Sequence, residues 1–233
     1  MVTAASRNRI VRALEPDELD RLQPHFEVVE MRQGETLARK GDAPTHLYFP
    51  ETAVVSMVAA TAGRVTVEVA FVGCESVAGA LALLGEASLP YDMIVNLPGA
   101  GVRVPVQAAR EAVTPHGQLR PLTERALRLL VVQVTQAAVC NRFHSPRQRL
   151  ARWLALASER VSSGVFPMTH EVMASMVGGA RSMVTQACNE LRDMGAVEYR
   201  RGALRVLDAD RLRAEACECY GVVTAAVNEM MAE

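Results

Sequence analysis

Apolar residues in the C-terminal third of the chain recur at steps of three and four, which is the period of an amphipathic helix. One helix is predicted over residues 169–177, with an inward stripe of Val172, Met173 and Met176. Gly178-Gly179 then supply a turn, because glycine adopts a left-handed backbone conformation at little cost. A second helix is predicted over residues 180–194 and ends at Gly195. Its buried face comprises Val184, Ala187, Leu191 and Met194.

Two short strands, residues 197–200 and 203–207, follow this helix pair and flank Arg201-Gly202. Helix, turn, helix and basic-tipped hairpin together predict a winged helix-turn-helix. The outer face of the second helix is polar and nearly free of acid over its first two turns, as a helix in a DNA major groove requires. The alternative for Arg181 is a solvated helix charge. The predicted contacts to double-stranded DNA are Thr169, His170, Arg181, Ser182, Thr185, Gln186 and Arg201.

The pattern between residues 26 and 113 is different, since short apolar runs alternate with Gly and Pro. Such runs predict a small antiparallel barrel or jelly roll. The segment Ser76–Leu84 is too rich in small residues for a strand and predicts a short helix over a pocket, and Leu97–Gly101 predicts a turn. The strand candidates are Phe26–Arg32, Leu47–Phe49, Ala53–Ala60, Val65–Val72, Met93–Leu97 and Gly101–Val106.

A long helix is predicted from Leu119 to about Phe143. Its apolar positions follow the alternating three- and four-residue spacing of a coiled-coil seam, which favours packing on a second copy. Burial of this helix within one chain is the alternative. A homodimer also suits a protein that binds palindromic DNA. The seam residues are Leu127, Leu130, Val134, Ala137 and Asn141.

Ser145-Pro146 marks a boundary, with Ser as N-cap and Pro at the first helical position. The helix that begins there places Trp153, the only tryptophan, as a core anchor. Asp208 caps a last helix that is expected to reach about Tyr220. The fold class is therefore α+β, with a sensor barrel and short N-terminal helices (residues 1–118), a dimerisation helix (119–144) and a winged helix-turn-helix with a C-terminal helix (145–233).

Charge and composition limit the function. The net charge of −1 excludes a uniformly basic binder, yet residues 145–206 hold nine Arg against five Asp or Glu, a local excess that suits phosphate. With neither a signal peptide nor an apolar run of membrane-spanning length, a cytoplasmic location without membrane association is expected. The sequence contains no catalytic constellation, so we expect no enzyme, no catalytic residue and no cofactor.

Five cysteines, an odd number without a disulfide spacing, indicate reduced thiols. Cys140 and His144 lie four apart on one helix face, but two ligands are too few for a metal site. Cys217 and Cys219 would lie on different faces of a helix, which favours ordinary packing over a redox role. No metal site is therefore predicted.

Barrel, long helix and winged helix occur here in the order typical of a known family. The chain resembles the bacterial Crp/Fnr transcription regulators over about residues 14–215. The resemblance rests on FEVVEMRQGETLARKGDAPTHLYF, PRQRLARWLAL and the stretch from Met168 to Asp208, of which the last is the most specific. It implies a homodimer with a cyclic-nucleotide-binding-like sensor domain on a pseudo-palindromic DNA site. RNA polymerase would be a further partner if the protein is an activator.

The sensor departs from the cyclic-AMP-binding members of that family. They use an acidic residue just after a glycine for the ribose, and an Arg-Ser or Arg-Thr pair for the phosphate. Here Ala80 follows Gly79, and Leu89-Pro90-Tyr91-Asp92 contains no Arg. The tentative effector pocket is Gly79, Ala80, Leu81, Pro90 and Tyr91, for an unknown small molecule other than cyclic AMP. The alternative function is a degenerate signalling or protein-interaction module without DNA readout.

Overall fold

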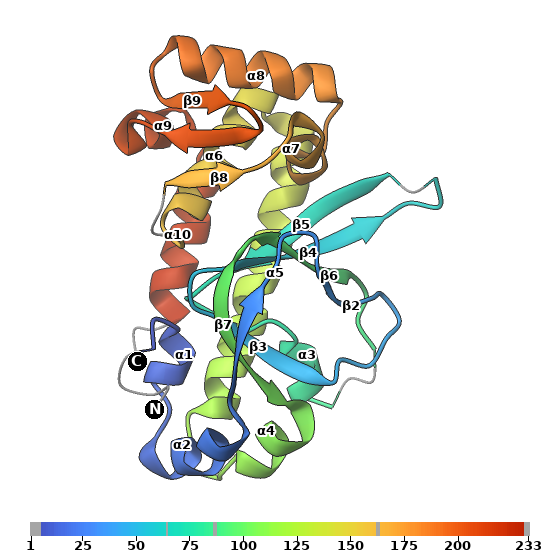
Figure 1. The fold of residues 1–233 in the computed structure, drawn as a ribbon, viewed down its shortest axis with the longest axis vertical. Helices are drawn as coiled ribbons and strands as arrows, with labels where there is room; N and C mark the ends of the chain where they lie inside the picture. Colours follow the sequence, from blue (N-terminus) through green and yellow to red (C-terminus); the bar gives the residue numbers. More distant parts are fainter. Residues whose placement is uncertain (1–5, 64, 86–87, 162–163, 231–233) are drawn as a thin grey trace. The chain divides into compact units, whose positions relative to one another are not determined.

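Residues 6–63, 65–85, 88–161 and 164–230 are described by the computed structural model (Figure 1). They form two units. The first comprises the residues up to Met57, Phe71–Val131 and the residues from Val227 on, and the second comprises Val58–Ala70 and Val132–Ala226. Both units therefore share the long helix, which was predicted as a separate part, and the second unit includes the tip of a sensor hairpin.

The first unit begins with three short helical segments. They are α1 (Arg9–Arg12), α2 (Pro16–Leu22) and the 3-10 helix η1 (Gln23–His25). Asn8 caps α1 by accepting from the backbone N–H groups of Ile10 and Val11. The buried Glu18 of α2 accepts from the N–H of Gln118 at 2.6 Å and of Leu119 at 3.0 Å, where the long helix begins. A carboxylate there satisfies donors that have no partner within the helix.

Two sheets build the jelly-roll-like sensor body, most of which belongs to the first unit (Figure 1). One has the order β1-β7-β3 and antiparallel pairing, with Val28 opposite Val102 and Leu47 opposite Val104. The other has the order β2-β6-β4-β5. The strands are β1 (Glu27–Met31), β2 (Thr36–Ala38), β3 (His46–Pro50), β4 (Val54–Ala60), β5 (Thr66–Val72), β6 (Asp92–Leu97) and β7 (Gly99–Pro105). Aliphatic side chains dominate the core between them.

The sensor helices are α3 (Ala80–Leu83), within the predicted segment Ser76–Leu84, and α4 (Val106–Ala112), which was not predicted. The predicted turn at Leu97–Gly101 is also wrong, because β7 starts at Gly99. A Cβ on Gly99 would lie 2.6 Å from the backbone of Thr52 and Ala53. Glycine is needed there for the close approach of another chain segment and not for a turn.

The long helix α5 (Leu119–Phe143) has the predicted bounds and two different faces. One face is buried within the chain and includes Leu122, Leu129 and Cys140. On the other, Val134 is 41% exposed, while Leu127 and Leu130 are half-buried and Asn141 is exposed. Ala137 was predicted on the seam, but it is only 8% exposed and lies on the buried side. The exposed Ala138 takes its place on the outer face.

After α5, the second unit continues with α6 (Pro146–Ser158), where Ser145 and Gln148 form a capping box. Trp153 is buried as predicted and packs edge-on against Phe166, with the ring centroids 6.3 Å apart. Its Nε1 donates a hydrogen bond to Glu68 Oε1 at 2.6 Å. The remaining elements are β8 (Val165–Pro167), α7 (His170–Val177), α8 (Arg181–Asp193), β9 (Val197–Arg200), β10 (Ala203–Val206), α9 (Ala209–Glu215) and α10 (Cys219–Met230).

The end of the chain differs from the prediction. One helix was expected from Ala209 to about Tyr220, capped by Asp208. The cap is present, since Asp208 accepts from the N–H of Arg211, but α9 stops at Glu215 and α10 starts at Cys219. The interruption at residues 216–218 removes the helical geometry that would place Cys217 and Cys219 on different faces.

Candidate nucleic-acid interface and sensor site

Helix α7, the turn and helix α8 form the helix-turn-helix (Figure 1). Thr169 caps α7, with its hydroxyl accepting from the N–H of Val172 at 3.2 Å. Gly178 ends α7 in the left-handed conformation, with φ of 62°. Ala180 holds the N-cap position of α8 in an extended conformation and provides no side-chain cap. The N–H groups of Arg181 and Ser182 at the start of α8 therefore receive no side-chain cap and can bond to solvent or a ligand.

Helix α8 is divided into a buried and a polar face. Val184, Ala187, Cys188 and Leu191 are buried, and burial raises the pKa of Cys188 to about 11. Arg181, Ser182, Gln186 and Asn189 are exposed, while Thr185 is half-buried. The face predicted to contact bases is thus accessible over the first turns of the helix.

Two of the predicted contacts already have partners within the helix. Gln186 Nε2 donates to Glu190 Oε1 at 2.9 Å, an exposed contact that a base edge can replace. Thr185 Oγ1 donates to the Arg181 carbonyl oxygen at 2.9 Å and also lies 2.9 Å from His170 Nδ1. These contacts occupy the Thr185 hydroxyl more fully than the Gln186 amide.

His170 lies in a supporting position behind α8. Its ring stacks on Tyr199 with centroids 4.6 Å apart, and burial together with the charge of Arg181 lowers its pKa. The neutral imidazole therefore links α7, α8 and the wing. Thr169, which is exposed at the start of α7, is better placed than His170 to meet a phosphate.

The wing is a three-stranded sheet in the order β8-β10-β9, although only two strands were predicted. Arg201 is exposed at its tip with φ of 49°. Two more exposed arginines, missed in the sequence, flank it: Arg205 on β10, and Arg200, which pairs with Glu198 at 2.8 Å. The sequence signal that could have identified them is the run of three arginines within six residues, which suits a wing that contacts phosphate.

Sequence reasoning also missed Arg149. It is buried on α6, and its Nη1 donates to Asn141 Oδ1 at 3.1 Å and to the Gly178 carbonyl oxygen at 3.2 Å. Burial lowers its pKa. One guanidinium thus connects the end of α5 with the turn of the helix-turn-helix, so that Asn141, predicted as a seam residue, also has a partner within its own chain.

The predicted effector residues lie around α3, and two of them line a pocket. Gly79 precedes α3 with φ of 91°, and Ala80 is buried in its first turn. Tyr91 is also buried, which raises its pKa to about 12. The pocket measures about 500 Å³ and is lined by Lys40, Gly41, Leu81, Ser88, Leu89 and Pro90. Among the described residues of this lining, Lys40 is the one that is charged.

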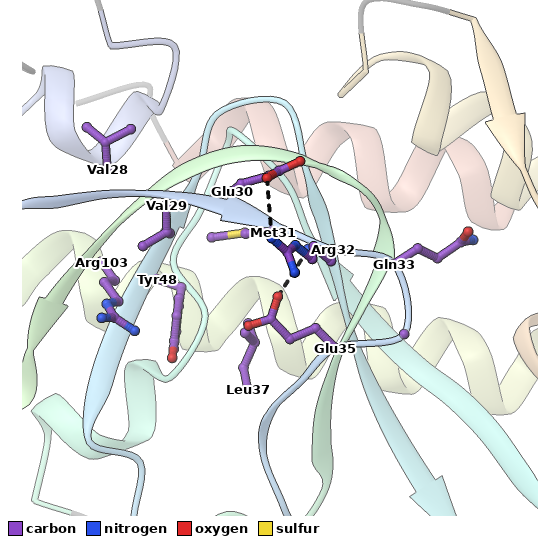
Figure 2. A pocket seen from close by; sticks show the side chains of 11 residues that line it. Val28, Val29, Glu30, Met31, Arg32, Gln33, Glu35, Leu37, Tyr48 and Arg103 are labelled. Carbon is purple, nitrogen blue, oxygen red and sulfur yellow. Dashed lines mark hydrogen bonds and ion pairs between the residues drawn. The ribbon is translucent and has the colours of Figure 1, made fainter.

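A larger pocket of about 720 Å³ lies elsewhere in the first unit, over β1 and the turn that follows it (Figure 2). None of the predicted effector residues lines it. Figure 2 shows Arg32 between Glu30 and Glu35, with its guanidinium 4.0 Å from Glu30 Oε2 and its backbone N–H 3.1 Å from Glu35 Oε2. Arg103 pairs with Glu27 at 2.6 Å on the neighbouring strand. Carboxylates therefore accompany both arginines, which does not favour an anionic ligand.

Comparison with known proteins agrees with this architecture. Residues 28–115 match the profile of the cyclic nucleotide-binding domain, and residues 148–215 match that of the Crp-like helix-turn-helix domain. The two matches span more than half of the chain. No curated protein is significantly similar to the chain in sequence.

Several solved structures share the fold. FixK2 from Bradyrhizobium japonicum is 14% identical, with a TM-score of 0.68 over 82% of this chain and 98% of that one. A transcriptional regulator of the CRP family from Thermus thermophilus is 20% identical, with a TM-score of 0.65 over 81% and 96%. The c-di-GMP responsive regulator CLP from Xanthomonas campestris is 15% identical, with a TM-score of 0.58 over 82% and 99%.

The fold and the exposed face of α8 define a DNA-binding regulator in which a cyclic-nucleotide-binding domain precedes a helix-turn-helix domain. The chain belongs to the Crp/Fnr family of transcription regulators, which are not enzymes. Within the described residues, no helix combines the length and the apolar character needed to span a bilayer.

Proposed function

We propose that the protein acts as a homodimer that binds a pseudo-palindromic site in double-stranded DNA and regulates transcription there. The observation that supports this most is the exposed, polar and acid-free N-terminal half of α8. Two copies related by a two-fold axis would place two such helices in successive major grooves.

Each exposed residue of α8 has a chemical role in this proposal. Arg181 donates to a guanine, the commonest specific contact of arginine in the major groove. Ser182 stands where family members that recognise the cyclic-AMP-receptor site often have Glu, which accepts from cytosine. Because a hydroxyl can pair with several bases, the operator should differ from that site at this position. Gln186 and Thr185 complete the base-facing set, and Thr169 and Arg201 contact phosphates.

The homodimer is supported by the outer face of α5. Leu127, Leu130, Val134 and Ala138 are exposed or half-buried at three- and four-residue steps. An apolar stripe of this period is the pattern that packs on a second helix.

The effector in this proposal is not cyclic AMP. Among the described residues that line the pocket beside α3 there is neither an arginine nor an acidic residue to hold the phosphate and the ribose, and Ala80 is buried where the acid would stand. A charge-assisted hydrogen bond of this kind contributes about 1.5–3 kcal/mol. Titration calorimetry with cyclic AMP is expected to give no binding heat at micromolar concentration, and tight binding would contradict the assignment. The effector is then an unidentified molecule, or the protein acts without an effector.

A gel shift against a pool of random-sequence duplexes tests the DNA-binding proposal. We expect enrichment of a palindrome, with binding that weakens as salt rises because phosphate contacts release counterions. A pool without salt-sensitive enrichment would favour the alternative, in which the winged helix contacts protein. If the protein is an activator, RNA polymerase is the expected protein partner.

A further inference from the structure

Four side chains with metal-binding atoms meet where α5 ends. Cys140 lies in the last turn of α5 and His144 directly follows that helix. Cys217 lies in the break between α9 and α10, and Cys219 is the first residue of α10. Their ligand atoms all lie within 4.8 Å of one another. The Sγ atoms of Cys140 and Cys217 are 3.5 Å apart, and Cys219 Sγ is 3.7 Å from His144 Nδ1. All three cysteines are buried, and the histidine side chain is 11% exposed.

These spacings fit a single tetrahedral ion. Zinc binds thiolate sulfur at about 2.3 Å and imidazole nitrogen at about 2.0–2.1 Å, so tetrahedral ligand atoms lie roughly 3.4–3.8 Å apart. The two contacts above agree with this range. An iron–sulfur cluster is itself several ångströms wide and holds its cysteine sulfurs further apart, so this set is too tightly gathered for one. Three cysteines and one histidine are an established ligand set for structural zinc.

The surroundings of the histidine also suit a metal ligand. Glu218 Oε1 lies 3.0 Å from His144 Nε2, on the ring nitrogen opposite the one that faces Cys219. A carboxylate in this place fixes the tautomer, with a proton on Nε2 and a free electron pair on Nδ1. Three thiolates, one neutral imidazole and one divalent cation leave a net charge of −1. The positive charge of Arg152 acts on Cys140 and Cys219 and offsets it.

We propose that Cys140, His144, Cys217 and Cys219 bind one zinc ion through three thiolates and His144 Nδ1. The position of the site gives it a structural role. His144 directly precedes Ser145, the N-cap of α6, so the ion would fasten the end of α5 to the segment between α9 and α10. It would fix the junction at which the dimer helix passes into the DNA-binding elements.

No metal site was predicted from the sequence, because the candidate ligands occur there as two separate pairs and neither pair is enough to bind a metal. Cys140 and His144 alone give two ligands, and Cys217 and Cys219 diverge if the C-terminal helix is continuous. The break at residues 216–218 directs both sulfurs to one point, and the tertiary fold brings that point to the end of α5. Neither step leaves a local signal in the sequence.

Metal analysis of the full-length protein, purified in reducing buffer without chelator, tests the proposal. We expect about one zinc per chain. Cobalt(II) added to the metal-free protein should give the intense visible bands of a tetrahedral site and a thiolate-to-cobalt charge-transfer band. Cys217→Ser should lose the metal. Cys188→Ser, the matched control at another buried cysteine of the same unit, should keep it.

Three results would overturn the assignment. The first is metal-free protein that yields no tetrahedral cobalt spectrum, a readout that holds even if Cys217→Ser fails to fold. The second is a Cys140–Cys217 disulfide in the freshly isolated protein, seen as three free thiols instead of five. The third is acid-labile sulfide with iron, which would identify a cluster. None of these readouts depends on DNA binding, so the metal site and the proposed function can fail separately.

Discussion

At the scale of single residues, the two helices of the helix-turn-helix differ in how they begin. Thr169 caps α7 with its hydroxyl, whereas Ala180 leaves α8 uncapped although its backbone has the extended conformation of an N-cap. Thr169→Ala is expected to lower the free energy of unfolding by about 1 kcal/mol, and Ala180→Ser to raise it by about the same amount. Urea unfolding of the two variants measures both changes. Equal stability of both variants and the wild type would contradict this account of the caps.

Arg201, at the wing tip, is expected to contact phosphate and no base. Arg201→Ala should therefore weaken binding to all duplexes alike and reduce the slope of log affinity against log salt by about 1. Anisotropy titrations at several salt concentrations measure both effects. Arg120→Ala is the matched control, because Arg120 is exposed but pairs with Glu124 far from α8 in the sequence. A loss confined to one base position would refute the phosphate role.

At the scale of elements, the outer stripe of α5 is the proposed dimer contact. Val134→Glu places a charge within that stripe, and the cost of burying it should shift the protein to monomers at micromolar concentration. Sedimentation velocity measures the change. Val28→Glu is the control, since Val28 is an equally apolar residue, 71% exposed, on strand β1. An unchanged dimer in Val134→Glu would remove this face from the interface.

Element prediction succeeded where the signal is local. The bounds of α5, α7 and α8 follow from apolar periodicity, from the Thr169 cap and from Gly178. Helix α4 and the break after α9 were missed for physical reasons. Val106–Ala112 is rich in small residues and follows a strand directly, and residues 216–218 contain neither Gly nor Pro. Strand β8 is short and is defined by its pairing with β10, which is a contact distant in sequence.

The candidate site divides in the same way. The exposed polar face of α8 could be predicted because it needs only the helix period and the positions of the polar residues. Arg149 could not, because its partners Asn141 and Gly178 lie on other elements. The four proposed metal ligands could not be predicted either, because they also come from separate elements. Prediction from sequence thus ends where a function depends on contacts between separate segments.

At the scale of the whole molecule, the metal site and DNA binding should be coupled. Zinc would order the junction between α5 and α6, so its removal should lower DNA affinity, by roughly 5–150-fold if the coupling has the usual magnitude of 1–3 kcal/mol. Anisotropy with and without a zinc chelator measures this. The Cys217→Ser variant should bind DNA weakly even without chelator, and the chelator should not change its affinity. Equal affinity with and without zinc would leave the ion without a role in DNA binding.

The most direct test of the central claim is a selection in which the wild type and Arg181→Ala are each offered the same random-duplex pool. The wild type is expected to enrich two symmetric half-sites about one helical turn apart. Arg181→Ala should lose its preference at one base pair in each half-site. Its binding to the wild-type site should weaken by about 1–3 kcal/mol of binding free energy per lost contact. Enrichment of the same site by both proteins with equal affinity, or of no palindrome by either, would contradict the claim that two copies of α8 recognise the DNA.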